Sequence, residues 1–457
     1  MNLLNRWSDP PPAYEPVDHD EDPSILRRKP RFSRFEYGVF FLLGVSMLWA
    51  WNMFLAASPY FHHRFEADPW AATNYQPSIL AVSTITNLGS SYTLARLQRG
   101  ASYPRRIVVS LLINVVVFTM LAISTVVARD ADVRFYFAFL MTMVCGASLA
   151  TGINQNGVFA YVAGFGREEY TQAIMGGQGV AGVLPCIVQI VSVLAVPRTT
   201  NQSGDPTEQD SEPVPPPPEN SSAASKSAFW YFLTATAVSS LALVSFLSLV
   251  RRQRRHHHHT TPPSQTIPNY TDLPTETDTI PPETETQTPL TTLFSKLRLL
   301  STSIFLCFAV TMIFPVYTSR ILPVTTTLRP EIFIPLAFLF WNAGDLTGRM
   351  LVLLPSLSTL AHRPRALFAL ALARVVFLPL YLLCNVDGQG AVFKSDAFYL
   401  VIVQLLFGAT NGFLSSSCMM GAGVWVDERE REAAGGFMSL MLVGGLAAGS
   451  LASFLVA

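Results

Sequence analysis

The 457-residue chain is half apolar and 14% charged, its 31 lysines and arginines equal its 31 acidic residues, and its mean hydropathy is +0.34. This composition excludes an ordinary soluble enzyme and indicates a polytopic membrane protein, and zero net charge gives no sign of a nucleic-acid partner. The five cysteines all lie in apolar runs, where we expect small packing residues rather than a disulfide framework.

Residues 1–34 form a polar, proline-rich segment whose composition predicts a disordered cytosolic N-terminus. It contains "PPAY", which matches the PPxY ligand of WW domains, and "EDPSIL", which resembles an acidic dileucine sorting signal. Such short motifs arise by chance. Together they predict a WW-domain protein and a sorting adaptor as partners, and they favour an endosomal, vacuolar or lysosomal membrane over the plasma membrane. The motif residues are Pro11, Pro12, Tyr14, Glu21, Ile25 and Leu26.

Apolar runs of about 17 to 25 residues, long enough to cross the hydrocarbon core, predict an all-α fold of eleven transmembrane helices. The polar loop 251–297 divides them into a six-helix bundle (35–250) and a five-helix bundle (298–457), a layout common in carriers. Disorder is expected in that loop and in loop 197–227. The spans begin near Phe35, Ser78, Ile107, Phe135, Ile174, Phe229, Leu300, Ile332, Ala366, Phe398 and Ala434.

The basic residues predict which side of the membrane each loop occupies. Most of the 31 lysines and arginines lie in residues 1–34 and in the loops after even-numbered spans. The positive-inside rule therefore predicts a cytosolic N-terminus and a non-cytosolic C-terminus. The sequons at Asn201 and Asn220 fall in a non-cytosolic loop and are candidate glycosylation sites. The run "RRQRRHHHH" after the sixth span indicates an anchor to anionic lipid, with metal binding by its histidines as the alternative.

The eighth span contains "FLFWNAGDLTGRM", which places an aspartate and an arginine at membrane depth. At about 100° per residue, Phe338, Asn342, Asp345 and Arg349 share one narrow stripe of the helix. Their carboxylate, guanidinium, amide and aromatic groups suit a ligand with hydroxyls and a flat ring. The alternatives are an i,i+4 ion pair that only neutralises itself and an Arg349 that extends to the membrane interface.

Glycines and polar residues elsewhere in the spans predict helix contacts. Gly344 and Gly348 form a separate small-residue face of the eighth span, and "MGGQGVAG" and "GGLAAG" have the same character. In "TGINQNGVF" the Asn154, Gln155 and Asn156 side chains point in three directions, so at most one or two can reach a cavity.

Trp51 lies deep in the first span, where it either stacks on a planar ligand or packs in the core.

Catalytic signatures are missing, because the sequence has no Walker loop, nucleophile elbow or plausible His/Cys ligand spacing. We therefore expect neither an enzyme nor a bound metal or cofactor.

From about Phe35 to the C-terminus the chain resembles the equilibrative nucleoside transporter family, with loops 197–227 and 251–297 as the divergent parts. The motifs that carry the resemblance are "AWNMF", "IMGGQGVAG", "FLFWNAGDLTGR", "RVVFLPLYLLCN", "ATNGFLSSSCM" and "EREAAGGFMSLMLVGGLAAGS". Ala50 departs from the pattern, because many members have a proline there, and this puts a bend of the first span in doubt. Leu55 departs where some members carry methionine.

The resemblance implies a major-facilitator-like fold of eleven spans and passive transport of nucleosides by alternating access. It implies that Asp345 and Arg349 bind the ribose hydroxyls, and that Gln155 and Trp51 lie beside the base. Leu55 and Leu446 then line the cavity, while Phe338 and Asn342 support the site.

Two other functions stay open at this point. One is a proton-coupled carrier of nucleosides, nucleobases or other polar solutes, and the other is a non-transporting receptor or scaffold. In each case we expect a monomer in the lipid bilayer.

Overall fold

The computed structural model describes residues 32–98, 100–128, 131–195, 219–260, 288–325 and 329–453. The chain divides into two units, Met1–Phe32 and Ser33–Ala457. Every helix of the described residues belongs to the second unit, which alone is discussed below. The predicted sorting motifs, from Pro11 to Leu26, and the sequon residue Asn201 lie outside the described residues.

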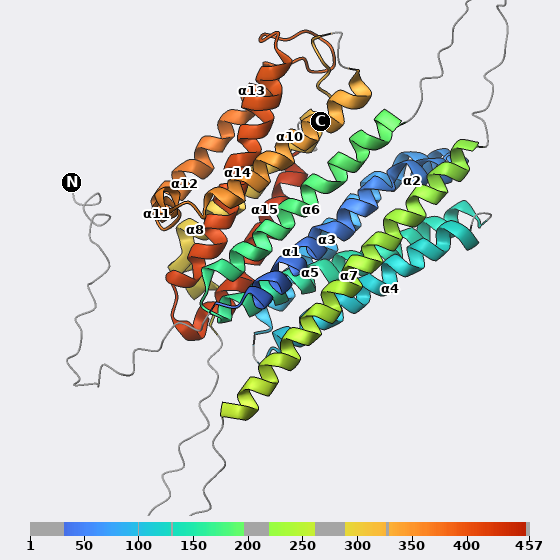
Figure 1. Cartoon of the computed structure of the whole chain (residues 1–457). Coiled ribbons are helices and arrows are strands. Elements are labelled where there is room, and N and C mark those ends of the chain that lie inside the picture. Colours follow the sequence, from blue (N-terminus) through green and yellow to red (C-terminus); the bar gives the residue numbers. More distant parts are fainter. Residues whose placement is uncertain are drawn as a thin grey trace, which may run out of the picture. The chain divides into compact units, whose positions relative to one another are not determined.

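The described residues are almost entirely helical (Figure 1). The α-helices are α1 (Arg34–Ala56), α2 (Ser58–Phe65), α3 (Pro69–Arg96), α4 (Tyr103–Val127), α5 (Val133–Gly164), α6 (Glu168–Ala195), α7 (Glu219–Thr260), α8 (Leu290–Thr311), α9 (Ile313–Thr318), α10 (Pro330–Leu351), α11 (Pro355–Ala361), α12 (Pro364–Ala373), α13 (Phe377–Leu382), α14 (Leu406–Gly421) and α15 (Arg431–Ser453). The other helical elements are the 3-10 turns η3 (Arg374–Val376), η5 (Ala422–Val424) and η6 (Glu428–Glu430) and the π-helix η4 (Phe398–Leu405).

Nine helical stretches of the described residues are long and apolar enough to cross a membrane. Two more helices are comparably long, α3 with 28 residues and α10 with 22, but they contain more polar side chains. Each of the eleven predicted starts lies in one of these helical stretches. A multi-pass helical membrane protein is thus confirmed, while the count of eleven spans stays a prediction.

Side-chain caps fix where several helices begin. Ser33 accepts a hydrogen bond from the backbone N–H of Glu36 at the start of α1. Asp68 accepts from the N–H groups of the first turn of α3, and Asp132 does the same for α5. These oxygens satisfy N–H groups that a helix leaves unpaired at its start. Helix α1 then runs unbroken through Ala50, the position where family members often have proline.

The helices extend into segments whose composition predicts disorder. Helix α7 begins at Glu219, inside loop 197–227, and continues to Thr260, while α8 begins at Leu290, inside loop 251–297. The physical reason lies in the residues that flank the apolar run. Alanine and serine before the run and arginine after it are compatible with helix, so α7 continues on both sides of the apolar span. Asn220 therefore lies in the first turn of α7.

Helices of the second half are more often interrupted than those of the first. We call α1 to α7 the first half and α8 to α15 the second half. Helix α8 gives way to α9 at Met312, three residues before Pro315. The 3-10 turn η3, which begins at Arg374, separates α12 from α13, and the π-helix η4 leads into α14. A proline removes a backbone donor, and such irregular turns often mark functional positions.

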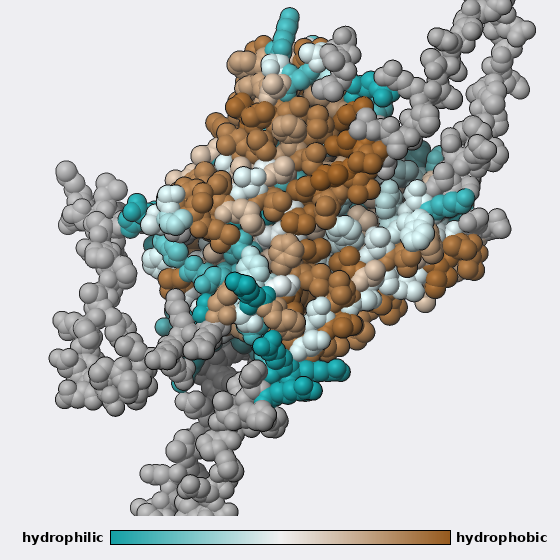
Figure 2. Space-filling view, in the orientation of Figure 1, coloured by the Kyte–Doolittle hydropathy of each residue, from teal (hydrophilic) through white to brown (hydrophobic). Residues whose placement is uncertain are grey.

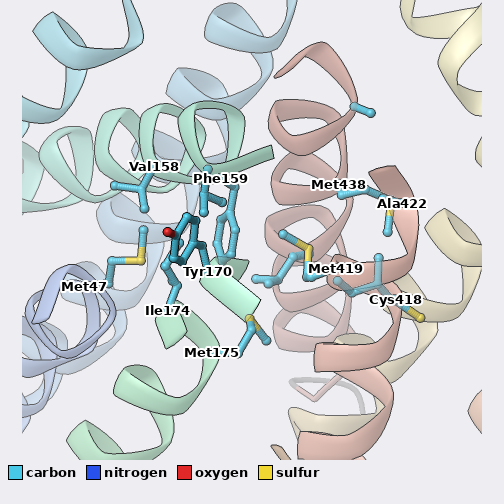
Figure 3. Packing of buried hydrophobic residues seen from close by; sticks show 14 of the residues in the cluster. Met47, Val158, Phe159, Tyr170, Ile174, Met175, Cys418, Met419, Ala422 and Met438 are labelled. Carbon is cyan, nitrogen blue, oxygen red and sulfur yellow. The ribbon is translucent and has the colours of Figure 1, made fainter. Parts of the chain in front are cut away.

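Three clusters of buried apolar residues hold the helices together. One lies entirely in the first half, around Phe61 and Phe232, and another lies entirely in the second half, around Trp341 and Phe407. The largest cluster joins both halves. In Figure 3, Tyr170 and Met175 of α6 lie between Met47 of α1 and Met419 of α14. The two halves are therefore packed against each other and not merely tethered.

Hydrophobic side chains also cover much of the visible flank of the helices, while hydrophilic ones gather mainly toward the helix ends (Figure 2). A flank of this kind suits contact with lipid chains. Helices α6 and α10, one from each half, run side by side in Figure 1 and are in contact. Their contact places the polar stripe of α10 beside the first half.

Candidate substrate-binding site

The centre of the candidate site is the ion pair on α10. Nε of Arg349 donates to Oδ2 of Asp345 at 2.7 Å, and the exposed fractions of the two residues are only 4% and 5%. The predicted i,i+4 pair is therefore confirmed as a contact. Arg349 does not extend to an interface, because its guanidinium is buried.

The second oxygen of Asp345 is held from α14. Nδ2 of Asn411 donates to Oδ1 of Asp345 at 2.7 Å. The side-chain oxygen Oδ1 of Asn411 in turn accepts from the Thr311 hydroxyl at 2.7 Å and from Nη2 of Arg374 at 3.2 Å. A buried network therefore connects α8, η3, α14 and α10 through groups of the second half alone.

Arg349 reaches from the second half to the first. Its Nη1 donates to the Met175 carbonyl at 3.0 Å and to Oε1 of Gln178 at 3.2 Å, both on α6. The Gln178 amide also contacts Sδ of Met47 on α1 at 3.3 Å. Among the hydrogen bonds that Arg349 makes within the described residues, none uses Nη2. The N–H groups of this nitrogen can therefore donate to a ligand.

Close contact between α10 and α14 fixes the position of Asp345. A Cβ atom on Gly344 would clash with the Leu405 carbonyl, and one on Gly412 would clash with the carbonyl of Asp345 itself. Gly348 is enclosed in the same way by the Ala409 carbonyl. The predicted glycine face of α10 is thus confirmed, because only glycine permits this approach of two backbones.

The other two residues of the α10 stripe also meet neighbours. Nδ2 of Asn342 donates to the Phe338 carbonyl at 2.9 Å and approaches Sγ of Cys186 on α6 at 3.5 Å. The Phe338 ring packs edge-on against Phe314, with centroids 5.0 Å apart. Asn342 therefore lies toward the first half, and Phe338 lies within the second.

The predicted contacts to a base are divided among other helices. Trp51 is half-buried and stacks parallel to Phe54, with 6.0 Å between ring centroids. Leu55, one turn further along α1, is 50% exposed, and Leu446 of α15 is partly buried against the shared core. Within the described residues, no hydrogen bond joins Gln155 to the Asp345–Arg349 pair.

Gln155 itself is buried on α5, and its Oε1 has no hydrogen-bond partner among the described residues. Its neighbour Asn156 differs, because its Oδ1 accepts from Nη1 of Arg106 on α4 at 2.6 Å. The Oδ1 of Asn154 also lacks a partner there. Amides of this stretch that do not reach a cavity are expected to bond across helices, and Asn156 does so.

Sequence reasoning missed part of this network. It assigned no role to Gln178, Thr311, Arg374 or Asn411, although Arg374 stands as a charge within an apolar run. That feature was the available signal, because an ionisable residue at membrane depth usually faces a polar partner.

The basic run that follows the sixth predicted span lies at the end of α7. Its arginines Arg251, Arg252, Arg254 and Arg255 are exposed.

The fold matches solved membrane transporters. The chain aligns with the fucose:proton symporter FucP of E. coli at a TM-score of 0.54, with 12% identity over 92% of this chain and 91% of that one. It aligns with an outward-facing bacterial homologue of the iron transporter ferroportin at 0.53, with 11% identity over 93% and 92%. The chain therefore has the fold of these major-facilitator-like proteins.

The sequence comparisons give the family. The nucleoside transporter family model matches residues 141–205 and 217–457. The nucleoside transporter FUN26 of Saccharomyces cerevisiae is 30% identical over 97% of this chain and 86% of its own length. Human equilibrative nucleoside transporter 2 is 26% identical over 93% and 98%. The chain belongs to the nucleoside transporter family, whose members here are transporters and not enzymes.

Proposed function

We propose that the chain carries nucleosides across its membrane by facilitated, alternating-access transport, with the ribose bound by Asp345 and Arg349. The observation that carries the proposal is the buried pair with hydrogen-bonding capacity to spare. Each Asp345 oxygen has one partner and a carboxylate oxygen accepts about two hydrogen bonds, so both oxygens can still accept from sugar hydroxyls. Nη2 of Arg349, which has no hydrogen-bond partner among the described residues, can donate to a sugar oxygen.

The charge balance of the pair explains why it can remain buried without substrate. A lone ion at this depth costs several kcal/mol, on the order of the insertion penalties for charged residues. Asp345 and Arg349 neutralise each other at 2.7 Å, and neutral amides hold both. A nucleoside therefore adds hydrogen bonds without having to supply a counter-charge.

For the base we propose the partners that the family resemblance implies. Trp51 stacks on the ring, and the unpartnered Oε1 of Gln155 accepts from an exocyclic amine or ring N–H. The exposed Leu55 and the partly buried Leu446 supply apolar walls. Phe338 and Asn342 support the site from α10.

Alternating access requires a closed end and an open end. The two halves are in contact where α6 and α15 begin. Nε2 of His362 is 3.1 Å from Oε1 of Glu168 at the start of α6. Near the start of α15, Gly435 packs so closely against α5 that an added Cβ would clash with the Phe159 carbonyl. By the positive-inside prediction this end is cytosolic. We therefore propose that this conformation is closed toward the cytosol.

The test is uptake into proteoliposomes by purified protein. Uridine and adenosine should be taken up, and 2′- or 3′-deoxynucleosides should be carried less well, because an unsatisfied buried partner costs about 1 to 3 kcal/mol. Equal uptake of the deoxynucleosides would count against ribose recognition. Stimulation by an imposed pH gradient would favour the proton-coupled alternative, and no uptake at all would favour a receptor or scaffold.

We also propose an intracellular membrane, endosomal, vacuolar or lysosomal, as the residence of the protein. The support is the pair of short motifs in the N-terminal segment, one for a WW-domain protein and one for a sorting adaptor. The double change Ile25→Ala with Leu26→Ala should then move the protein to the plasma membrane in fluorescence microscopy. An unchanged distribution would remove the dileucine signal from the proposal.

A further inference from the structure

Arg374 is the largest fully buried side chain of the described residues, with 1% of its surface exposed, and the ribose site proposed above does not include it. Its four hydrogen bonds end on neutral groups: the Phe407 carbonyl, the Thr410 hydroxyl, the Thr311 hydroxyl and the Asn411 amide oxygen. Its guanidinium also lies over the Phe407 ring at 4.6 Å. Within the described part of the chain no carboxylate contacts this guanidinium, and a buried arginine in that position is costly and calls for a function.

The Asn411 amide lies between this cation and the anion of the ribose site. Its oxygen is 3.2 Å from Nη2 of Arg374, and its nitrogen is 2.7 Å from Oδ1 of Asp345. A carboxylate only accepts hydrogen bonds and a guanidinium only donates them. Rotating the amide by 180° would set oxygen against carboxylate and N–H against guanidinium, so the two charges together fix its orientation.

We propose that Arg374 and Asn411 are positioning residues for the substrate site, with Arg374 orienting the Asn411 amide and the amide aligning the Asp345 carboxylate toward the sugar hydroxyls. This inference rests on the proposed ribose-binding role of Asp345. Because Asn411 holds Oδ1 and Arg349 holds Oδ2, the plane of the carboxylate is fixed before substrate arrives. Pre-alignment of this kind improves recognition without an added contact to the ligand.

The location of Arg374 fits such a role. It begins the turn η3, which interrupts the helix formed by α12 and α13, so its side chain enters the bundle at an irregular point. Thr311 supports the same arrangement from α8, since its hydroxyl contacts both Arg374 at 2.9 Å and Asn411 at 2.7 Å. A network from α8, η3 and α14 thus ends on the Asp345 carboxylate of α10, which only Asn411 of these three elements contacts directly.

The test compares uridine with 3′-deoxyuridine in proteoliposomes and measures KM and Vmax for each substrate. Arg374→Gln removes the charge that orients the amide, and Asn411→Ala removes the amide. Each should reduce the preference in Vmax/KM for uridine by about fivefold to tenfold, the scale of one misaligned hydrogen bond, mainly by raising the KM for uridine. Arg374→Lys keeps the charge and should restore part of the preference.

Gln404→Leu is the matched control. Gln404 is a buried amide of the π-helix that leads into α14, and it bonds to Thr318 at 2.9 Å and to the Tyr381 hydroxyl, outside the Asp345 network. Its loss should change the amount of folded protein and Vmax but leave the preference intact. Combining Arg374→Gln with Asn411→Ala should reduce the preference no further than Asn411→Ala alone, because the two residues act in series.

The outcomes separate the two proposals. If Asp345→Asn leaves the wild-type preference unchanged, the ribose-binding role itself fails. If Asp345→Asn abolishes the preference while Arg374→Gln and Asn411→Ala lower Vmax equally for both substrates, Arg374 and Asn411 only stabilise the fold and the inference is overturned. Should these variants not fold, Thr311→Val must still reduce the preference in the same direction, and an unchanged preference overturns the inference.

Discussion

Two arginine–aspartate pairs in this molecule have the same distance between nitrogen and oxygen but differ in their surroundings. Arg349 and Asp345 meet at 2.7 Å with side chains 4% and 7% exposed, and Arg320 and Asp387 also meet at 2.7 Å with both side chains 37% exposed. The buried pair accepts a hydrogen bond from Asn411 and donates one to Gln178, whereas the side chains of the exposed pair are accessible to solvent. The contact distance therefore says little about function until burial and further partners are known.

The largest effect is expected from Asp345→Asn, which keeps the shape of the side chain and removes its charge. Vmax/KM for uridine should fall roughly 10- to 100-fold, because charge-assisted hydrogen bonds to the sugar are lost. Radiolabelled uptake normalised to folded protein is the measurement. A purely structural pair would instead lower the folded yield, since breaking a buried ion pair can cost about 3 to 5 kcal/mol.

A second change tests how α14 positions the buried pair. Gly412→Ala would push a methyl group into the Asp345 carbonyl, and overpacking of this kind costs about 1 to 3 kcal/mol. We expect a lower melting temperature in detergent and a higher KM for uridine. The matched control is Gly38→Ala on α1, where an added Cβ meets nothing within 4 Å. A similar loss in both variants would show that tight helix contact at Asp345 is unimportant.

A smaller effect is expected on the other side of the site. Gln155→Ala should change the order of preference among nucleosides by a few-fold while leaving stability intact, because its Oε1 has no partner to lose among the described residues. Trp51→Ala should weaken transport of all nucleosides alike. Asn156→Ala is the contrast, since it breaks the 2.6 Å contact with Arg106 and should lower the melting temperature. Competition assays with a nucleoside panel give the ranking, and equal small effects of Gln155→Ala and Trp51→Ala would mean that both only pack.

The smallest effect is expected at the exposed pair. Arg320 lowers the pKa of Asp387 through a direct hydrogen bond, and Asp387 raises the pKa of Arg320 in return. A lowered carboxyl pKa contributes stability above the unfolded value of about 3.9 and loses it only as the pH falls through the folded value. Because both side chains are exposed, Asp387→Asn should change uptake and melting temperature only slightly, and by the same small amount at pH 7 and at pH 5. A marked loss over that range would assign this loop a larger role than its exposure indicates.

Local sequence patterns were sufficient to predict contacts between residues that are close together in the sequence. The i,i+4 contact of Asp345 with Arg349 and the glycine face of Gly344 and Gly348 follow from the period of one helix. The partners of the pair come from other elements: Gln178 lies 171 residues before Arg349, and Asn411 lies 66 residues after Asp345. No periodicity connects such positions, so only the fold could bring them together.

Helix ends and breaks were the other limit. Composition predicted disorder for residues that continue α7 and begin α8, because helical spans can extend past the apolar run that identifies them. The turn at Arg374 has no glycine within it, and its nearest proline is Pro379, so the sequence offered little to reveal it. The base contacts are proposed from the resemblance to a family, because composition and spacing do not determine them.

The most direct test of the substrate-binding claim is uptake by the double variant Asp345→Asn with Arg349→Gln, reconstituted in proteoliposomes beside the wild type. Removing both charges relieves the burial penalty that either single change leaves behind, so folded protein should be recovered. If the pair binds ribose, this folded variant should take up uridine at least about tenfold more slowly and should no longer distinguish uridine from 3′-deoxyuridine. Uptake at the wild-type rate by a normally expressed double variant would contradict the claim and leave the pair a structural element.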